Sequence, residues 1–359
     1  MKKEKRLLRV GVLGCGPISQ AAHLEASLKA RNAELYAVCD LAEDLVEKIA
    51  ARFEPRKTFT DYDAMLADPK VEAVVVAIAD QFHVDAAIRA LKAGKHVLVE
   101  KPLGTTIADC ERLATQVRDS KLIAQVGTMK RFDPGIRDAQ RFLAEEGGEI
   151  LALKAWYCDS IYRYIETDNL QPLMLTSAAV RRPKGNPKAN LPVYYLLGHG
   201  SHLFDTALFL GGPIRALRAT LTEKFDSLCW MITAEFESGF VGHLDLTMPV
   251  RMGWHEGFQV YAEGGTVLGR TDNPWYFRSS EVECFSVKDG AARKVHGADA
   301  HFYKVQLEGF ADSVLHGAPQ HGATAEDGTH VLRALTAVSK ACRTGERVVL
   351  ADIGAEEIV

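Results

Sequence analysis

The sequence predicts an N-terminal Rossmann-type doubly wound parallel sheet followed by an α+β domain with a large, mostly antiparallel open sheet. Three observations predict this α/β architecture. The chain has 359 residues, which exceeds one ordinary compact domain. Its first 127 residues alternate short apolar runs with amphipathic stretches, whereas the later strand-like runs are longer and alternate apolar with polar residues. We therefore expect one domain over residues 1–127 and a second over 128–359, with the alternative that the C-terminal segment of the second packs back on the first.

The first domain contains five short runs that are apolar and rich in Val or Ile, as buried parallel strands are. These expected strands are Leu7–Leu13, Glu34–Cys39, Ala73–Ile78, His96–Val99 and Leu122–Val126. Amphipathic stretches at Leu41–Phe53 and Asp85–Ala93 predict helices between the strands, and Gly94 is typical of a helix C-terminus. Strand and helix alternation with buried strands predicts a doubly wound sheet.

The second domain shows the period-two pattern of strands with one covered face. Three such strands are expected at Ile214–Lys224, Leu228–Glu237 and Phe240–Met248, the last two joined by a tight turn at Ser238-Gly239. Helical patterns that would pack on this sheet lie at Gly135–Glu145, Ser201–Leu210, Phe302–His316 and Ala325–Cys342. Residues Ser160–Leu197 fit neither pattern and are rich in Tyr, Arg and Pro. A lid over a substrate is the preferred interpretation of this segment, and a subunit contact is the alternative.

The composition predicts a globular cytoplasmic protein and excludes several functional classes. The net charge is −4 and the basic residues are scattered, so a nucleic-acid-binding surface is not expected. The one basic cluster, Lys2 to Arg6, is interpreted as a solvated arm, and no apolar run reaches the ~18 residues of a membrane span. Seven widely spaced cysteines without a CxxC motif are expected to be reduced and structural.

A glycine-rich turn follows the first expected strand in the segment Val10-Gly-Val-Leu-Gly-Cys-Gly-Pro-Ile-Ser19. Gly14 allows a tight turn, and Gly16 lets backbone N–H groups approach a pyrophosphate at the start of a helix. Pro17 and Ile18 complete this expected cofactor loop, and Ser19 stands at the third glycine position of the GxGxxG fingerprint.

Asp40 ends the second expected strand about twenty residues later, where a carboxylate can accept hydrogen bonds from the adenosine ribose. A carboxylate there would repel a 2′-phosphate, and the next residue is Leu41 rather than Arg. The sequence therefore predicts NAD as the cofactor, with NADP less favoured. A plain helix N-cap is the alternative role of Asp40 and is compatible with the first.

The fourth expected strand runs into the segment Val97-Leu-Val-Glu-Lys-Pro-Leu103. A lysine at the carboxyl end of a buried strand, on the cofactor side of the sheet, is costly unless it has a function. Lys101 is therefore a candidate catalytic residue, and Glu100 is a candidate for keeping it charged. Pro102 turns the chain away from the strand.

The segment Gly94-Lys-His-Val97 leading into Glu100-Lys-Pro102, after an N-terminal GxGxI, resembles the glucose-fructose oxidoreductase / inositol dehydrogenase family, called Gfo/Idh/MocA. Arg131–Pro134 and Ala341–Val349 extend the resemblance over nearly the whole chain. It implies that Lys101 lies beside the nicotinamide and the substrate hydroxyl. It also implies cofactor contacts for His83, Ala79 and Glu100, although Ala79 and Asp80 replace the proline and asparagine that are usual in the family.

A second catalytic segment, Leu197-Gly-His-Gly-Ser-His-Leu-Phe-Asp205, is similar to the family pattern D-x-G-x-H-x-x-D. The resemblance implies that His202 is the acid/base residue, while Gly198 replaces the first Asp. His199 is the candidate for taking over part of the missing carboxylate's role, with a purely structural histidine as the alternative. Residues expected to bind substrate are Lys101, His199, His202, Tyr195 and Arg131.

The chemistry is consistent without the resemblance, because a histidine that titrates near neutrality can take a hydroxyl proton while an ammonium stabilises the alkoxide. No metal is expected, since His199 and His202 lack a third ligand at recognisable spacing. The expected enzyme is an NAD(P)-dependent oxidoreductase that acts on a CH–OH group of a sugar, inositol, other polyol or glycoside. An NAD-dependent glycosidase that oxidises its substrate transiently and a non-catalytic NAD-binding regulator are the alternatives.

The sheet of the second domain is expected to have an amphipathic face that its helices do not cover, which is typical of an interface. The resemblance implies that subunits pair through this sheet, so we expect a homodimer or homotetramer.

Overall fold

The chain divides into two compact units, each of which is built from three separate stretches of sequence. The computed structural model describes residues 6–180, 190–354, 356 and 358. The first unit comprises Met1–Met129, Gln171–Gly185 and His301–Thr329, and the second comprises Lys130–Leu170, Asn186–Ala300 and His330–Val359. A single boundary at residue 127 therefore does not describe the division. Local sequence patterns predict helices and strands, but they do not predict which of the two units a segment such as His301–Thr329 joins.

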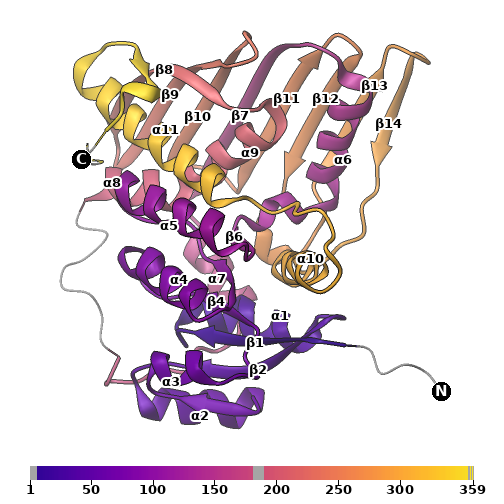
Figure 1. Cartoon of the computed structure of the whole chain (residues 1–359). Coiled ribbons are helices and arrows are strands. Elements are labelled where there is room, and N and C mark those ends of the chain that lie inside the picture. Colours follow the sequence, from indigo (N-terminus) through magenta and orange to yellow (C-terminus); the bar gives the residue numbers. More distant parts are fainter. Residues whose placement is uncertain (1–5, 181–189, 355, 357, 359) are drawn as a thin grey trace. The chain divides into compact units, whose positions relative to one another are not determined.

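The first unit contains a six-stranded parallel sheet with the order β3-β2-β1-β4-β5-β6, drawn in dark colours in Figure 1. Its strands are β1 (Leu8–Leu13), β2 (Ala33–Cys39), β3 (Lys57–Phe59), β4 (Ala73–Val76), β5 (His96–Val99) and β6 (Ala124–Val126). This order confirms the predicted doubly wound sheet and reverses direction between β1 and β4, where such sheets bind ligands. β3 was not predicted, because Lys57 and Thr58 are exposed and give no apolar signal.

Helices connect the strands of this sheet and carry several of the predicted site residues. They are η1 (Ser19–His23), α1 (Leu24–Lys29), α2 (Glu43–Phe53), α3 (Tyr62–Ala67), η2 (Asp80–Phe82), α4 (His83–Lys92), α5 (Ile107–Ser120) and α10 (Phe302–His316). The dinucleotide-type helix after β1 begins as one π-helical turn, η1, and continues as α1. The predicted helices after β2 and β4 are present, with starts that differ by two residues from those expected.

The position of α10 differs from the prediction that it packs on the second sheet. It belongs to the first unit, where it contacts α1, η1 and strands β1, β2 and β5. Polar contacts help to fix it there: a Glu308 side-chain oxygen accepts a hydrogen bond from the Arg31 backbone N–H at 2.9 Å, and the Glu308 carbonyl accepts one from Asn32 at 2.9 Å. The apolar period predicted a half-buried helix but not the partner of its buried face.

The second unit contains a nine-stranded sheet with the order β14-β13-β12-β11-β7-β10-β9-β8-β15. Its strands are β7 (Ile150–Ser160), β8 (Ile214–Lys224), β9 (Ser227–Phe236), β10 (Val241–Val250), β11 (His255–Ala262), β12 (Gly265–Thr271), β13 (Glu281–Ser286), β14 (Ala291–Val295) and β15 (Val348–Val349). β7 and β10 pair in parallel, and the other pairs of this described sheet are antiparallel. The predicted mostly antiparallel sheet is confirmed.

Ten helical segments accompany this sheet in the described part of the second unit. They are η3 (Met129–Phe132, whose first residue belongs to the first unit), α6 (Pro134–Phe142), η4 (Leu143–Gly147), α7 (Arg163–Leu170), α8 (Leu191–Tyr195), η6 (Leu196–Gly200), α9 (Ser201–Gly211), η7 (Pro274–Tyr276), α11 (Ala325–Thr344, whose residues 325–329 belong to the first unit) and η8 (Leu350–Asp352). Figure 1 shows α6, α9 and α11 in front of the sheet, and α9 contacts β7 while α6 contacts β12 and β13. Side chains of α9 therefore face side chains of β7, and this contact brings together several residues of the candidate site.

The segment 160–197 contains more regular structure than the sequence suggested. α7 and α8 lie within it, and residues 171–180 join the first unit without forming a helix or strand. There Gln20 of η1 hydrogen-bonds the backbone N–H of Leu175 at 2.8 Å and its carbonyl at 2.9 Å. Arg181, Arg182, Lys184 and Lys188, which the sequence placed in this segment, lie outside the described residues. Its predicted role as a lid stays a prediction.

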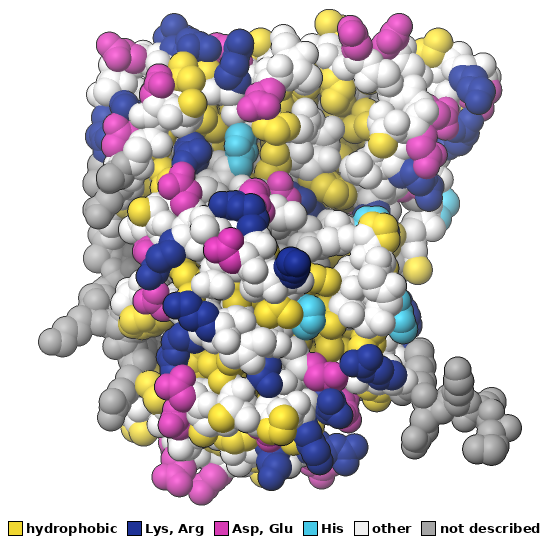
Figure 2. Space-filling model, in the orientation of Figure 1, with side chains coloured by type: hydrophobic (Ala, Val, Ile, Leu, Met, Phe, Trp, Pro, Cys, Tyr) yellow, Lys and Arg dark blue, Asp and Glu magenta, His cyan; other side chains and the backbone are white. Residues whose placement is uncertain are grey.

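Charge is dispersed over the surface. Figure 2 shows basic and acidic side chains interspersed on the visible face, as expected for a chain whose basic residues are scattered. Among the described residues, no helix is long and apolar enough to cross a membrane.

Candidate active site

The glycine turn after β1 has the geometry of a dinucleotide cradle. Gly14 has φ of +96°, and a Cβ there would lie 2.4 Å from the Ala77 carbonyl oxygen, so only glycine fits. A Cβ built on Gly16 would meet no atom within 4 Å, which leaves room for a phosphate to approach the backbone. Ser19, at the third fingerprint position, donates a hydrogen bond to the Gly14 carbonyl at 2.6 Å. The serine therefore ties the turn to the helix that follows.

Asp40 lies at the end of β2 and holds this cradle in place. One carboxylate oxygen accepts from the Cys15 N–H at 2.8 Å and the other accepts from the Ala42 N–H at 3.0 Å. The N-cap residue of α2 is Ala42 and not Asp40, so the simple N-cap alternative is wrong. A half-buried carboxylate beside the glycine turn fits the ribose of a dinucleotide. Gly14, Gly16 and Asp40 would thus hold NAD.

The other predicted cofactor residues lie around the same end of the sheet. Pro17 is exposed, and Ile18 and Ala79 are half-buried. His83 is buried, with Nδ1 2.8 Å from the Pro102 carbonyl and Nε2 3.0 Å from the Ile78 carbonyl. His83 therefore ties the end of β4 to the turn that follows Lys101, which is a positioning role; direct contact with the cofactor stays a prediction.

Glu100 and Lys101 follow β5 directly. Oε1 of Glu100 lies 2.8 Å from His23 Nε2, and Oε2 accepts from the Lys101 backbone N–H at 3.1 Å. Burial raises the pKa of Glu100, but the hydrogen bond to His23 and the charges of His23 and Lys101 outweigh it and lower the pKa overall. Glu100 is therefore a buried carboxylate that favours a charged Lys101.

Sequence reasoning missed His23, although it connects the cofactor helix to the Glu100–Lys101 segment. Its side chain is 3% exposed on η1 and lies edge-on to the ring of Tyr303. No motif marks a histidine at this position. Only the three-dimensional meeting of η1 and β5 reveals the contact.

His202 lies in the first turn of α9, and its ring is parallel to that of Tyr157 on β7, with centroids 6.0 Å apart. α9 is anchored by Asp205, which accepts from Arg131 Nε at 3.0 Å and from Arg131 Nη2 at 2.8 Å. Both side chains are at most 7% exposed. The two motif residues Arg131 and Asp205 thus form one buried ion pair, which gives Arg131 a positioning role; its predicted substrate contact stays a prediction.

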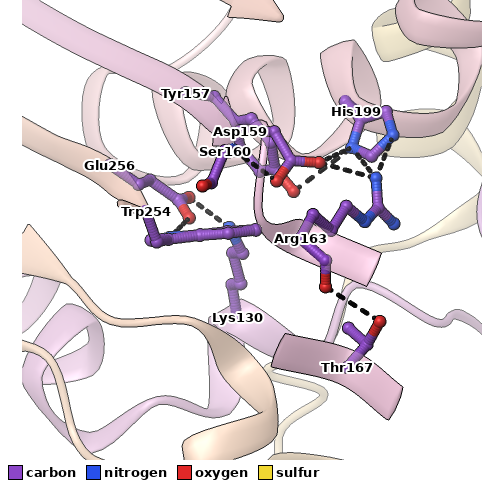
Figure 3. Close-up of polar contacts among 9 residues, drawn as sticks. All are labelled: Lys130, Tyr157, Asp159, Ser160, Arg163, Thr167, His199, Trp254 and Glu256. Atoms are coloured by element: carbon purple, nitrogen blue, oxygen red, sulfur yellow. Dashed lines mark hydrogen bonds and ion pairs between the residues drawn. The ribbon is translucent and has the colours of Figure 1, made fainter. Parts of the chain in front are cut away.

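His199 lies in η6, one turn before His202, and its side chain is 5% exposed. Arg163 Nη1 lies 2.7 Å from its Nε2, and the Tyr157 hydroxyl lies 3.3 Å from its Nδ1 (Figure 3). The ring of Tyr195 contacts it edge-on, with centroids 5.8 Å apart. His199 is therefore the centre of a polar and aromatic cluster, while its own contact with substrate stays a prediction.

A second buried pair lies on the other side of Tyr157. Lys130 forms an ion pair with Glu256, and its ammonium lies 4.5 Å from the Tyr157 ring centroid (Figure 3). Trp254 Nε1 donates to Glu256 at 3.2 Å. Burial raises the pKa of Glu256, and the charge of Lys130 opposes this. The pair is expected to fix the ring of Tyr157 against the two histidines.

Sequence reasoning missed Lys130, Tyr157, Asp159, Trp254 and Glu256. Tyr157 and Asp159 are two residues apart at the end of β7, so the period of a strand places both on one face. That spacing was an available signal. Lys130 and Glu256 are 126 residues apart, and nothing local connects them. Among the described residues, no group of three or more His, Cys, Asp or Glu side chains could hold a metal ion.

A glycine turn of the dinucleotide-binding type after β1, with a carboxylate at the end of β2, is typical of a nicotinamide-dependent oxidoreductase. Residues 8–128 match the family described as "Oxidoreductase family, NAD-binding Rossmann fold", GFO_IDH_MocA. The chain is 28% identical over 344 residues to inositol 2-dehydrogenase 2 of Saccharopolyspora erythraea, covering 93% of this chain and 92% of that protein. The match to this family model lies in the N-terminal part of the chain, which includes the glycine turn and the Glu100-Lys-Pro102 segment that carry the resemblance.

Solved structures show the same fold over nearly the whole chain. Levoglucosan dehydrogenase in complex with NADH and levoglucosan has a TM-score of 0.78 and 19% identity, covering 96% of this chain and all of that one. An NAD-binding oxidoreductase from Klebsiella pneumoniae has a TM-score of 0.80 and 18% identity, covering 97% of this chain and 99% of that one. The predicted fold class, oxidoreductase class and nicotinamide cofactor are confirmed.

We expect the Arg131–Asp205 pair to be essential for the stability of the second unit. Arg131→Gln or Asp205→Asn leaves a buried charge without its partner, which costs about 3 kcal/mol or more. Urea unfolding should therefore show a large drop in the free energy of unfolding. The control is Arg112→Gln, which breaks the exposed pairs of Arg112 with Asp85 and Asp109 and should change stability little. An equally small effect of Arg131→Gln would contradict this role.

Proposed function

We propose that this protein is an NAD-dependent dehydrogenase that oxidises a secondary hydroxyl of a sugar, inositol, other polyol or glycoside, or reduces the corresponding ketone. The observation that carries the proposal is the combination of the Gly14–Asp40 cradle with Lys101 at the end of β5 and His202 on α9. The relatives support it, since one is an inositol 2-dehydrogenase and another binds NADH with levoglucosan.

In the proposed mechanism, His202 accepts the proton of the reacting hydroxyl, and Lys101 holds that oxygen and stabilises the developing negative charge. NAD, when bound, supplies the hydride acceptor. Lys101 and His202 belong to different units, so the proposal requires that both reach the same hydroxyl. Glu100 and His23 position Lys101 from one unit, and the Arg131–Asp205 pair positions the helix of His202 in the other.

Tyr195, Arg131 and His199 are proposed to shape the substrate side of the site. Tyr195 is half-buried beside His199, and an aromatic ring there can cover the apolar face of a sugar. Arg131 and His199 are nearly buried, and they support the surface on which substrate lies.

The proposed reaction predicts net NADH formation, which absorbance at 340 nm measures in a screen of inositols, aldoses and glycosides. Lys101→Met removes the ammonium charge while keeping a side chain of similar length, and His202→Ala removes the proposed base. A positioned proton acceptor accelerates such a reaction by a factor of about 10² to 10⁴. Both variants should lose turnover while calorimetry shows that NAD still binds. The wild-type kcat/KM for oxidation should rise with pH through a group that titrates near neutrality, and His202→Ala should lose this limb.

The same screen decides between the proposal and its alternatives. Glycoside cleavage without net NADH would indicate a glycosidase that oxidises transiently. NAD binding without any turnover would indicate a regulator. Near wild-type turnover in Lys101→Met would overturn the mechanism.

Asp40 is predicted to set the cofactor preference. NAD should bind at least about tenfold tighter than NADP, or ~1.4 kcal/mol, because the carboxylate accepts from the ribose and repels a phosphate. Asp40→Asn should narrow this ratio in calorimetric titrations. Glu43→Gln, an equal charge change at an exposed site on α2, is the control and should leave the ratio unchanged. Equal affinities of the wild-type protein for NAD and NADP would refute the role of Asp40.

A homodimer or homotetramer is proposed to form through the sheet of the second unit. The strands carry half-exposed apolar side chains such as Met231, Leu268 and Phe285, and apolar sheet surface of this kind is typical of an interface. Light scattering at micromolar concentration should show an assembly that Leu268→Glu weakens. Leu173→Glu, at a 91% exposed leucine of the first unit, is the control. A wild-type monomer would exclude this assembly.

A further inference from the structure

Arg163, Asp159 and His199 form a connected group at the end of β7 and the start of α7. Arg163 Nη1 donates to Asp159 Oδ2 at 2.7 Å and lies 2.7 Å from His199 Nε2 (Figure 3). Asp159 also accepts from the Ser160 N–H at 2.8 Å, and Thr167 of α7 donates to the Arg163 carbonyl at 2.9 Å. The group therefore fixes the first turn of α7 against β7 and η6.

The protonation of His199 follows from its contact with Arg163. Arg163 Nη1 lies 2.7 Å from Nε2 and 3.4 Å from Nδ1 of His199. A guanidinium has only donors, so the nearer ring nitrogen, Nε2, accepts, and the proton of a neutral ring is then on Nδ1. Nδ1 points toward the Tyr157 hydroxyl at 3.3 Å and lies 4.0 Å from Asp159 Oδ2. A protonated Nε2 would bring two donors and two positive charges together at 2.7 Å. The geometry therefore favours a neutral His199, and within this group the carboxylate of Asp159 opposes the charge of Arg163.

Exposure distinguishes the three members of the group. The side chains of Asp159 and His199 are 3% and 5% exposed, whereas that of Arg163 is 27% exposed. Tyr157 links the group to His202, because its ring contacts both histidines, with centroids 5.6 Å and 6.0 Å away. Arg163 is thus the member that reaches solvent, and it does so one aromatic layer from the proposed base.

We propose that Arg163 is a specificity-determining residue that donates to a hydroxyl of the substrate, and that Asp159 cancels its charge so that the site selects uncharged polyhydroxylated substrates over sugar acids. His199 is a positioning residue that orients the guanidinium. The inference rests on the proposed function, whose substrate class it narrows. It also assigns to Arg163 the substrate contact that the sequence suggested for His199.

The physical basis is the placement of the buried carboxylate. A hydroxyl oxygen accepts from an arginine whether or not that arginine is already paired. A carboxylate on the substrate gains little from a guanidinium that Asp159 already neutralises, and it meets the charge of Asp159 across a short, poorly solvated distance. The same pair therefore accepts an alcohol and disfavours an acid.

A charge series on this pair tests the inference. The probes are glucose and glucuronate, which differ by a carboxylate in place of a hydroxymethyl group, together with myo-inositol. Calorimetry on the NAD-loaded protein gives the dissociation constants, and the melting temperature shows that each variant is folded. The wild-type protein should bind glucose at least about tenfold tighter than glucuronate, because like charges brought together are strongly disfavoured.

Asp159→Asn removes the carboxylate that opposes the charge of Arg163 and should shift this preference toward glucuronate. Arg163→Gln should weaken glucose binding by about tenfold, the usual effect of losing a hydrogen bond to a charged group, and should exclude glucuronate further. The double variant Asp159→Asn/Arg163→Gln lacks both charges. Its ratio of glucose to glucuronate affinity should therefore return toward the wild-type ratio, although it binds both sugars more weakly. If Asp159→Asn does not fold, the glucose and glucuronate affinities of Arg163→Gln and of the double variant still test the inference.

Asp289→Asn and Arg293→Gln are matched controls, because Asp289 and Arg293 form a pair with the same four-residue spacing at the β13–β14 hairpin. They should leave the ratio unchanged. A constant glucose-to-glucuronate ratio across the series, or unchanged glucose binding in Arg163→Gln, would overturn the inference. Binding of a neutral probe with the expected series but without oxidation would instead overturn the proposed function alone. If none of the three probes binds, the substrate class is wrong and the inference falls with it.

Discussion

A buried charge requires a partner, and this constraint determines how the candidate site is built. Glu100 lies against His23, Asp205 against Arg131, Glu256 against Lys130 and Asp159 against Arg163. Leaving any of these groups unpaired would cost several kcal/mol, so each pair forces two elements together. The first pair joins the cofactor helix to the strand of Lys101. The other three join η3 to α9, η3 to β11 and α7 to β7.

The constraint also explains how several motif residues are placed in the structure. Arg131 and Asp205 are far apart in sequence, yet each is needed because the other is buried. His83 contacts two backbone carbonyls and connects the end of β4 with the turn after Lys101. These contacts hold the elements that carry the proposed catalytic groups.

The cofactor half of the site was largely predictable from sequence, because its features are local. Gly14 and Gly16 follow directly after β1, Asp40 follows β2 and Lys101 follows β5, so strand endings alone bring them to one edge of the sheet. In the second unit, the sequence did not predict the Lys130–Glu256 pair, because these residues meet across 126 residues. The packing of α10 in the first unit was not predicted either, because an apolar period does not specify the sheet that a helix covers. Arg163 was visible only as one of several basic residues in an irregular segment.

The proposed mechanism requires that Lys101 and His202 act together on one hydroxyl, although they belong to different units of the chain. A double-mutant cycle on kcat/KM with the best substrate measures this directly, using Lys101→Met, His202→Ala and the double variant. Groups that act as one unit have non-additive effects, so the double variant should be little worse than either single variant. Multiplication of the two single effects in the double variant would show that the residues act independently and would contradict the account.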